Sequence, residues 1–247
     1  MSQAEVVEYA ARGDIALITI RRPEKRNAIN ARVALDLQAA WARFEAGAER
    51  VAVLTGEGPT FSSGADVSDP PELWRAMPGI AARVEKPVIA ATSGYVIGGA
   101  IVLVQFCDLC VAAESTQFVY PEARLGFTGG MIAGIAARLP HKIAMELLML
   151  GHPMSARRAY EVGFVNKVVP DGQQVEAALE WADELAGYAP LVLRTLKRFV
   201  TDYVLPKGPS ELMAIATRDL EVVRNSEDIA EGRAAWHEKR RARFKGR

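Results

Sequence analysis

Residues 86–130 contain the side chains and glycines of this sequence that could carry out chemistry. A short apolar run that predicts a buried strand is followed by three glycines and then by apolar residues 100–106, which we expect to form a buried helix. Glycines before a helix leave free backbone N–H groups at the positive end of the helix dipole, where negative charge is stabilised. Glu122 follows later, after a proline and among apolar residues. An anion-stabilising turn and one carboxylate are the groups needed to form and protonate an enolate.

Several segments of the sequence match those of a known protein family, and they occur in the family's order over nearly the whole chain. They are residues 22–23, 27–30, 61–67, 86–91, 94–100, 121–126, 238–240 and 244–247. In these segments the chain resembles the crotonase (enoyl-CoA hydratase/isomerase) superfamily. The resemblance implies an α/β fold, a crotonase-like right-handed spiral of ββα units with an all-helical C-terminal region. It also implies an enzyme acting on acyl-CoA thioesters, with coenzyme A as part of the substrate and no separate cofactor.

The same resemblance assigns roles to particular residues. The backbone N–H groups of Ala65 and Gly99 would bind the thioester oxygen, and Glu122 would be the acid/base. Physical chemistry supports these roles, because a preorganised donor at developing negative charge contributes ~3 kcal/mol and burial raises a carboxyl pKa toward a useful value. The other residues expected at the substrate site are Ser63, Gly64, Asp66, Gly98, Val102, Tyr120 and Arg26.

Each of these assignments has an alternative that needs no ligand. The glycines before the helix can serve tight packing of a strand against a helix. Glu122 can lie at the surface, paired with Arg124 or Lys86. Structural or solvated positions are the alternatives for Asp66, Tyr120 and Arg26.

Val102 distinguishes this sequence from the hydratases of the family. Those enzymes carry a second glutamate three residues after the oxyanion glycine, and two carboxylates hold and activate one water, which a valine cannot do. A single glutamate at the Glu122 position is similar to the Δ3,Δ2-enoyl-CoA isomerases, in which one base moves a proton between C2 and C4. We therefore expect isomerase chemistry, with an enoyl-CoA hydratase or another enolate lyase or hydrolase as the alternative. A non-catalytic acyl-CoA binder is the third hypothesis.

The composition is balanced in charge and rich in apolar residues. Lys plus Arg and Asp plus Glu each number 30 among the 247 residues, and 50% of the chain is hydrophobic. This composition gives no sign of a nucleic-acid partner or of membrane binding, and we expect a cytoplasmic protein without a signal peptide. Cys107 and Cys110 have the C-x-x-C spacing, but no second ligand pair accompanies them, so we expect two small buried residues and no metal site.

Strand and helix patterns alternate to about residue 170 and only helices follow, which predicts an α/β core with a helical tail. Strands are expected at residues 6–9, 15–20, 51–55, 87–91, 109–113 and 165–169, and helices at residues 31–46, 100–106, 131–139, 143–150, 156–161, 175–185, 192–203, 211–223 and 227–243. Residues 69–82 fit no clear pattern; by resemblance they lie over the acyl group. We expect a core of residues 1–190 and a helical oligomerisation region of residues 191–247. The resemblance implies a homotrimer or a dimer of trimers.

Overall fold

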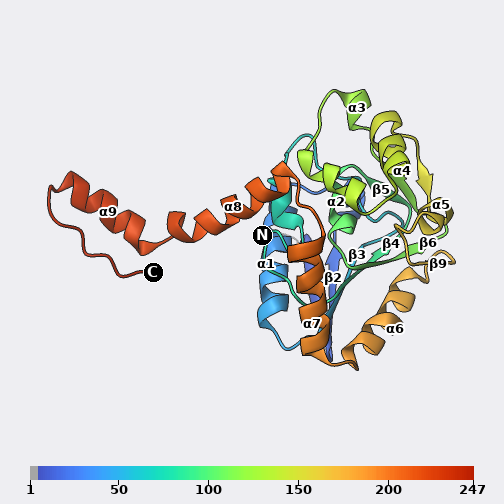
Figure 1. Cartoon of the computed structure of the whole chain (residues 1–247), viewed down its shortest axis with the longest axis horizontal. Coiled ribbons are helices and arrows are strands. Elements are labelled where there is room, and N and C mark those ends of the chain that lie inside the picture. The colour runs from blue at the N-terminus through green and yellow to red at the C-terminus, as the bar shows by residue number, and fades with distance from the viewer. Residues whose placement is uncertain (1–4) are drawn as a thin grey trace.

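A six-stranded sheet lies at the centre of the protein, whose computed structural model describes residues 5–247 (Figure 1). Its strands, in spatial order, are β1 (Val7–Arg12), β2 (Ile15–Ile20), β3 (Val51–Gly56), β4 (Val88–Thr92), β6 (Leu109–Ala113) and β9 (Lys167–Val169). β1 and β2 form the predicted antiparallel hairpin, and all other neighbours are parallel. β3 and β4 are fully buried along their lengths, as expected for parallel strands that are covered on both faces.

Alternate residues of these strands form two apolar layers, one on each face of the sheet. The layer that includes Val53 and Ile89 packs against α6 (Gln174–Ala186), whose inward side is built from alanines. The layer that includes Ile18 packs against α1 (Ala31–Ala46). The sheet is therefore a rigid support on which the connecting loops are fixed.

A smaller three-stranded sheet positions the segments in which we expect the chemistry. β5 (Tyr95–Ile97) pairs in parallel with β7 (Gln117–Val119), and β7 pairs antiparallel with β8 (Met154–Ser155). Because β5 and β7 are parallel neighbours, the chain leaves both strands at the same edge, and the Gly98 N–H donates to Val119 O at 2.9 Å. The sequence predicted no strand at these three places, since two or three residues are too few to show a period.

Several predicted helices differ from the observed ones. Residues 131–139 were expected to be helical, and the structure has a 3-10 helix, Gly130–Ala137, in a stretch where glycines weaken an α-helix. The helix expected at residues 143–150 begins as α4 (His141–Met145) and continues as a π-helix (Glu146–Leu150). The prediction that the last helix reaches residue 243 is wrong, because it ends at His237. The boundaries of α1 are as predicted, and its N-cap Asn30 accepts a hydrogen bond from the Val33 N–H.

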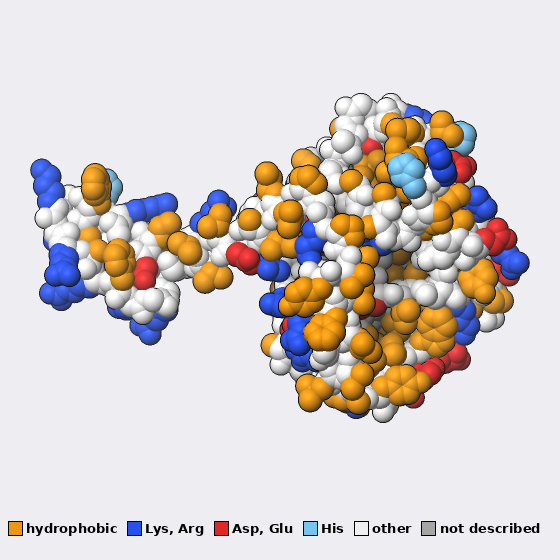
Figure 2. Space-filling view, in the orientation of Figure 1, with side chains coloured by type: hydrophobic (Ala, Val, Ile, Leu, Met, Phe, Trp, Pro, Cys, Tyr) orange, Lys and Arg blue, Asp and Glu red, His pale blue; other side chains and the backbone are white. Residues whose placement is uncertain are grey.

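Within the described residues 191–247, the C-terminal region contains helices and no strand, as predicted, and its last part projects from the body. α7 (Pro190–Phe199) lies along the body and continues into a π-helix, η5 (Val200–Val204); α8 (Pro209–Arg224) leads outward to α9 (Glu227–His237) (Figure 1). Hydrophobic side chains are exposed along α7 and on the projecting helices (Figure 2), among them Leu191, Phe199, Tyr203, Val222 and Trp236. The boundary at residue 190 and a role of this region in oligomerisation stay predictions.

Candidate active site

The first bend of the candidate site is the loop of residues 61–66, whose backbone is attached to β5. The Ile97 N–H donates to Ser62 O at 3.1 Å. Gly64 has a φ of +86°, and a Cβ there would collide with the Ile97 carbonyl oxygen, so this position requires glycine. Among residues 5–247, the N–H of Ala65, the next residue, has no hydrogen-bond acceptor.

The second bend faces the first one. Gly98, with a φ of +53°, precedes α2 (Gly99–Gln105), and within the described chain the Gly99 N–H also has no acceptor. A Cβ built on Gly64 would lie 3.3 Å from the Gly99 nitrogen, and a Cβ built on Gly99 would lie 3.5 Å from the Ala65 nitrogen. The structure therefore brings together the two N–H groups that the sequence singled out.

Glu122 lies beside the second bend and is buried with one carboxyl oxygen unpaired among residues 5–247. It begins α3 (Glu122–Leu125), directly after the segment that follows β7. Its side chain is 6% exposed, its Oε2 has no hydrogen-bond partner among residues 5–247, and a Cβ on Gly98 would collide with its Oε1. Burial away from water raises the pKa of Glu122 to about 7. A carboxyl group with this pKa can accept and return a proton at neutral pH.

The surface pairing considered for Glu122 does not occur. Arg124 donates instead to Leu150 O at 2.6 Å. Lys86 is 8% exposed, and its ammonium donates to Phe44 O at 2.7 Å and to Gly47 O at 2.8 Å. Neither cation is therefore available to offset the burial of the Glu122 carboxyl group.

Apolar side chains flank the same bends. Val102 is 2% exposed and lies three residues after Gly99 on α2. A Cβ on Gly99 would lie 2.9 Å from Leu73 Cδ2, so the Leu73 side chain packs directly over this glycine. The sequence predicts no role for Leu73, because the residues around it show neither a helical nor a strand period.

The Asp66 carboxylate is paired with neighbouring side chains. Its carboxylate lies 3.2 Å from Arg22 Nη1, and its Oδ1 accepts a hydrogen bond from Ser68 Oγ at 2.6 Å. The hydrogen bonds from Ser68, and then Arg22, lower the pKa of Asp66. Asp66 therefore fixes the chain after the first bend.

The remaining predicted residues lie around the two bends with different degrees of exposure. Tyr120 is 4% exposed, its hydroxyl lies 2.8 Å from Thr128 Oγ1, and burial raises its pKa. The Ser63 N–H donates to Arg26 O at 2.9 Å, so Arg26 adjoins the first bend through its backbone while its side chain is exposed.

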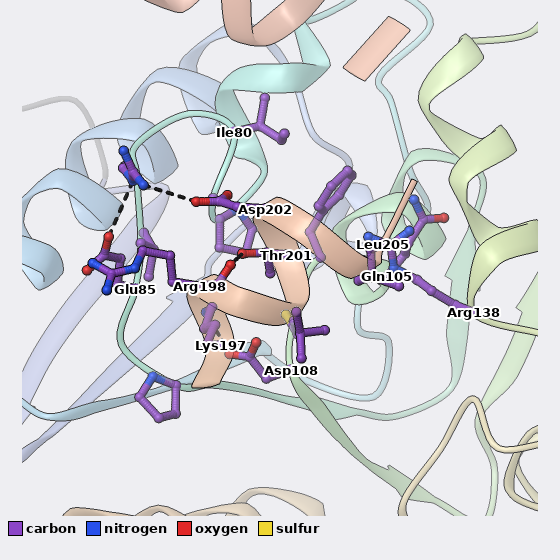
Figure 3. Close-up of a pocket in the computed structure, with 18 of the residues that line it drawn as sticks. Ile80, Glu85, Gln105, Asp108, Arg138, Lys197, Arg198, Thr201, Asp202 and Leu205 are labelled. Carbon is purple, nitrogen blue, oxygen red and sulfur yellow. Dashed lines mark hydrogen bonds and ion pairs between the residues drawn. The ribbon is translucent and has the colours of Figure 1, made fainter. Parts of the chain in front are cut away.

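A separate cavity of about 820 Å³ lies at the other end of α2, beneath α7 and α8 (Figure 3). Its lining is largely apolar and does not include Glu122, Ala65 or Gly99. Gln105 and Glu211 line it as well, and each has a buried side-chain oxygen without a partner in the part of the chain that the structure describes. The N-terminal and C-terminal ends of α2 therefore face different spaces.

The structure provides no grouping typical of metal or disulfide chemistry in residues 5–247. No three His, Cys, Asp or Glu side chains there are placed to hold a metal ion. Cys107 and Cys110 are unpaired thiols, and burial raises the pKa of Cys110 to about 12. No helix in the described range is long and apolar enough to cross a membrane.

Nearly the entire chain is similar to known proteins in sequence and in structure. A family model described as enoyl-CoA hydratase/isomerase matches residues 10–247. Carnitinyl-CoA dehydratase of Salmonella typhi is 35% identical over 261 residues, which cover 99% of this chain and 100% of that protein. The crystal structure of carnitinyl-CoA hydratase from Mycobacterium avium is 34% identical, with a TM-score of 0.78 and coverage of 99% and 100%. That of enoyl-CoA hydratase from Mycobacterium tuberculosis H37Rv is 32% identical, with a TM-score of 0.76 and coverage of 98% and 99%.

Proposed function

Since the chain belongs to the enoyl-CoA hydratase/isomerase family and is an enzyme of that type, we propose that it forms the enolate of an acyl-CoA thioester between its two bends, with Glu122 as acid/base. The observation that carries this proposal is the buried Glu122 carboxyl group beside Gly98, whose Oε2 has no hydrogen-bond partner among residues 5–247. The N–H groups of Ala65 and Gly99 support it, because the two bends lie close together and neither N–H has an acceptor among residues 5–247.

In this proposal the backbone stabilises charge and the carboxyl group moves a proton. The two N–H groups donate to the thioester oxygen while the Glu122 carboxylate takes a proton from the α-carbon. Negative charge then develops on that oxygen, and each preorganised donor contributes ~3 kcal/mol to the stabilisation of the transition state. With a pKa of about 7, Glu122 is present in both protonation states near neutral pH and can return the proton.

Val102 favours Δ3,Δ2-enoyl-CoA isomerisation as the net reaction. In that reaction one carboxyl group takes the proton from C2 and returns it to C4, and no water is needed. Val102 stands where the hydratases carry their second glutamate, and it is an apolar residue with 2% exposure. Its side chain offers no group to hold a water molecule.

Hydration or dehydration is the second candidate, and the names of the relatives favour it. Proteins 34–35% identical to this chain are named carnitinyl-CoA dehydratase or hydratase. In a dehydration, Glu122 takes the α-proton and passes it to the β-hydroxyl, so the C–O bond breaks and water leaves from the β-carbon. Because Val102 cannot hold that water, residues of the segment 69–82 must do so.

Exchange of the α-proton in deuterated water tests the step that both reactions share. Wild-type protein should incorporate deuterium into saturated acyl-CoAs, and Glu122→Gln should abolish incorporation. Glu161→Gln, the same change at an exposed pair with Arg157 on α5 (Ala156–Glu161), is the matched control. Absence of exchange over several chain lengths would contradict the proposal and favour a non-catalytic acyl-CoA binder.

Conversion assays then separate the two net reactions. An isomerase converts 3-enoyl-CoA into the 2-enoyl form and does not hydrate crotonyl-CoA. Measurable hydration of crotonyl-CoA would instead support the hydratase assignment despite Val102.

We also propose a homotrimer or a dimer of trimers, with coenzyme A as part of the substrate and no separate cofactor. The exposed apolar side chains of α7, α8 and α9 support association, because large apolar surfaces on a monomer mark interaction sites. Sedimentation equilibrium measures the state directly, and a monomer at micromolar concentration would refute it. A cytoplasmic location stays a prediction.

A further inference from the structure

Residues 72–86 connect the first bend to β4 and place one side chain over the candidate site. Leu73, the first residue of the 3-10 helix Leu73–Ala76, packs over Gly99. The end of this 3-10 helix is fixed to α1, because the buried Trp41 indole N–H donates to Ala76 O at 2.7 Å. The position of this segment therefore determines how much space lies over Gly99.

The same segment is held from its other side by the C-terminal helices. Five polar contacts reach it in succession from α7, η5 and α8, and we call them the C-terminal clamp. They join Arg75 to Glu221, Ile80 O to Arg218, Arg83 to Asp202, Glu85 to Arg194 and Lys86 O to Lys197. Figure 3 shows Glu85, Asp202 and Lys197 around the cavity between the segment and these helices.

The contact nearest Leu73 is also well shielded from solvent. The side chains of Arg75 and Glu221 are 15% and 22% exposed, and Arg75 Nη1 lies 3.1 Å from Glu221 Oε2. This hydrogen bond lowers the pKa of Glu221, so the carboxylate is ionised at neutral pH. Arg75 Nη1 also donates to Gln38 Oε1 on α1 at 2.8 Å, which links α8, the segment and α1 at one point.

We infer that the C-terminal helices set the acyl-group selectivity of the site, through a clamp in which Arg75 and Glu221 are positioning residues for Leu73. The inference rests on the proposed function, since it concerns the acyl side of the same site. It assigns these helices a role within their own subunit that is separate from any role in assembly. Neither residue touches the reacting atoms; each acts through the segment it holds.

Hydrogen–deuterium exchange of the backbone tests the clamp independently of catalysis. Glu221→Gln keeps the shape of the side chain and removes its charge. Loss of one ion pair of this kind should raise the exchange rate of amides in residues 73–84 about fivefold. Glu161→Gln removes the same charge from an exposed pair within α5 and should leave residues 73–84 unchanged. Equal exchange in wild-type and Glu221→Gln protein would overturn the clamp.

Binding of saturated acyl-CoAs measures selectivity without requiring turnover. The ratio of the dissociation constants of acetyl-CoA and octanoyl-CoA, measured by calorimetry, should change about fivefold in Glu221→Gln and stay at the wild-type value in Glu161→Gln. Adding Glu221→Gln to Arg75→Gln should change the ratio no further, because the contact that Glu221→Gln removes is already lost in Arg75→Gln. An unchanged ratio in Glu221→Gln, even with faster amide exchange, would overturn the role in selectivity. Failure of wild-type protein to exchange α-protons would refute the proposed function alone, whereas failure to bind either thioester would overturn both.

Discussion

Replacing Glu122 with glutamine should stabilise the protein much more at pH 8 than at pH 5. Burial raises the pKa of this carboxyl group from 4.5 to about 7, so the folded state binds the proton more tightly than the unfolded state does. The free energy of unfolding contributed by Glu122 therefore falls as the pH rises from 4.5 to about 7. Between pH 5 and pH 8 this loss amounts to about 2–3 kcal/mol, and glutamine, which does not titrate, avoids it.

Urea unfolding of both proteins at pH 5 and pH 8 measures this difference. The stability gap between Glu122→Gln and wild type should widen by about 2–3 kcal/mol at the higher pH, while the gap between Glu161→Gln and wild type should stay nearly constant. Equal gaps for Glu122→Gln at both pH values would show that the carboxyl group is hydrated in the folded protein. That result would remove the physical basis for its role as a base near neutral pH.

Three further substitutions test other parts of the site. Gly98→Ala should reduce α-proton exchange at least ~100-fold, because a Cβ collides with the Glu122 carboxyl group and φ is +53°; the rate in deuterated water measures this loss. Val102→Glu should introduce crotonyl-CoA hydration at a cost of about 2–4 kcal/mol in stability, since it buries a carboxyl group at a position with 2% exposure; spectrophotometric assay and urea unfolding check the two effects. Asn27→Ala should destabilise the protein by about 3 kcal/mol in urea, because the fully buried Asn27 side chain makes three hydrogen bonds to backbone around the first bend.

Local sequence signals predicted the parts of the fold that depend on local chemistry. The apolar runs of β4 and β6, the glycines before α2 and the Asn30 cap of α1 each specify an element through neighbouring residues alone. The residues of the two bends were found through their resemblance to a family, since glycines and one glutamate do not reveal by themselves that they face one another.

Features that depend on distant contacts were not predictable in this way. β5, β7 and β8 are two or three residues long and exist because they pair with one another. Leu73 lies in a segment without a sequence period. The Trp41 indole holds this segment, and so does the contact of Arg75 with Glu221, which is 146 residues away from Arg75 in sequence. Neither partner can be inferred from the residues adjacent to Leu73, so its position over Gly99 was missed.

Two departures from the ordinary rules of stable folding meet beside β5 and β7. Gly98 adopts a positive φ, and the atoms nearest to a side chain built there belong to the Glu122 carboxyl group. That carboxyl group is buried with one oxygen unpaired among the described residues. A fold selected for stability alone would place an apolar residue at Glu122, because burying an unpaired carboxyl group is costly. Glycine is required at this position by its positive φ and by the adjacent glutamate, and stability does not explain that glutamate. Chemistry at this carboxyl group accounts for both residues.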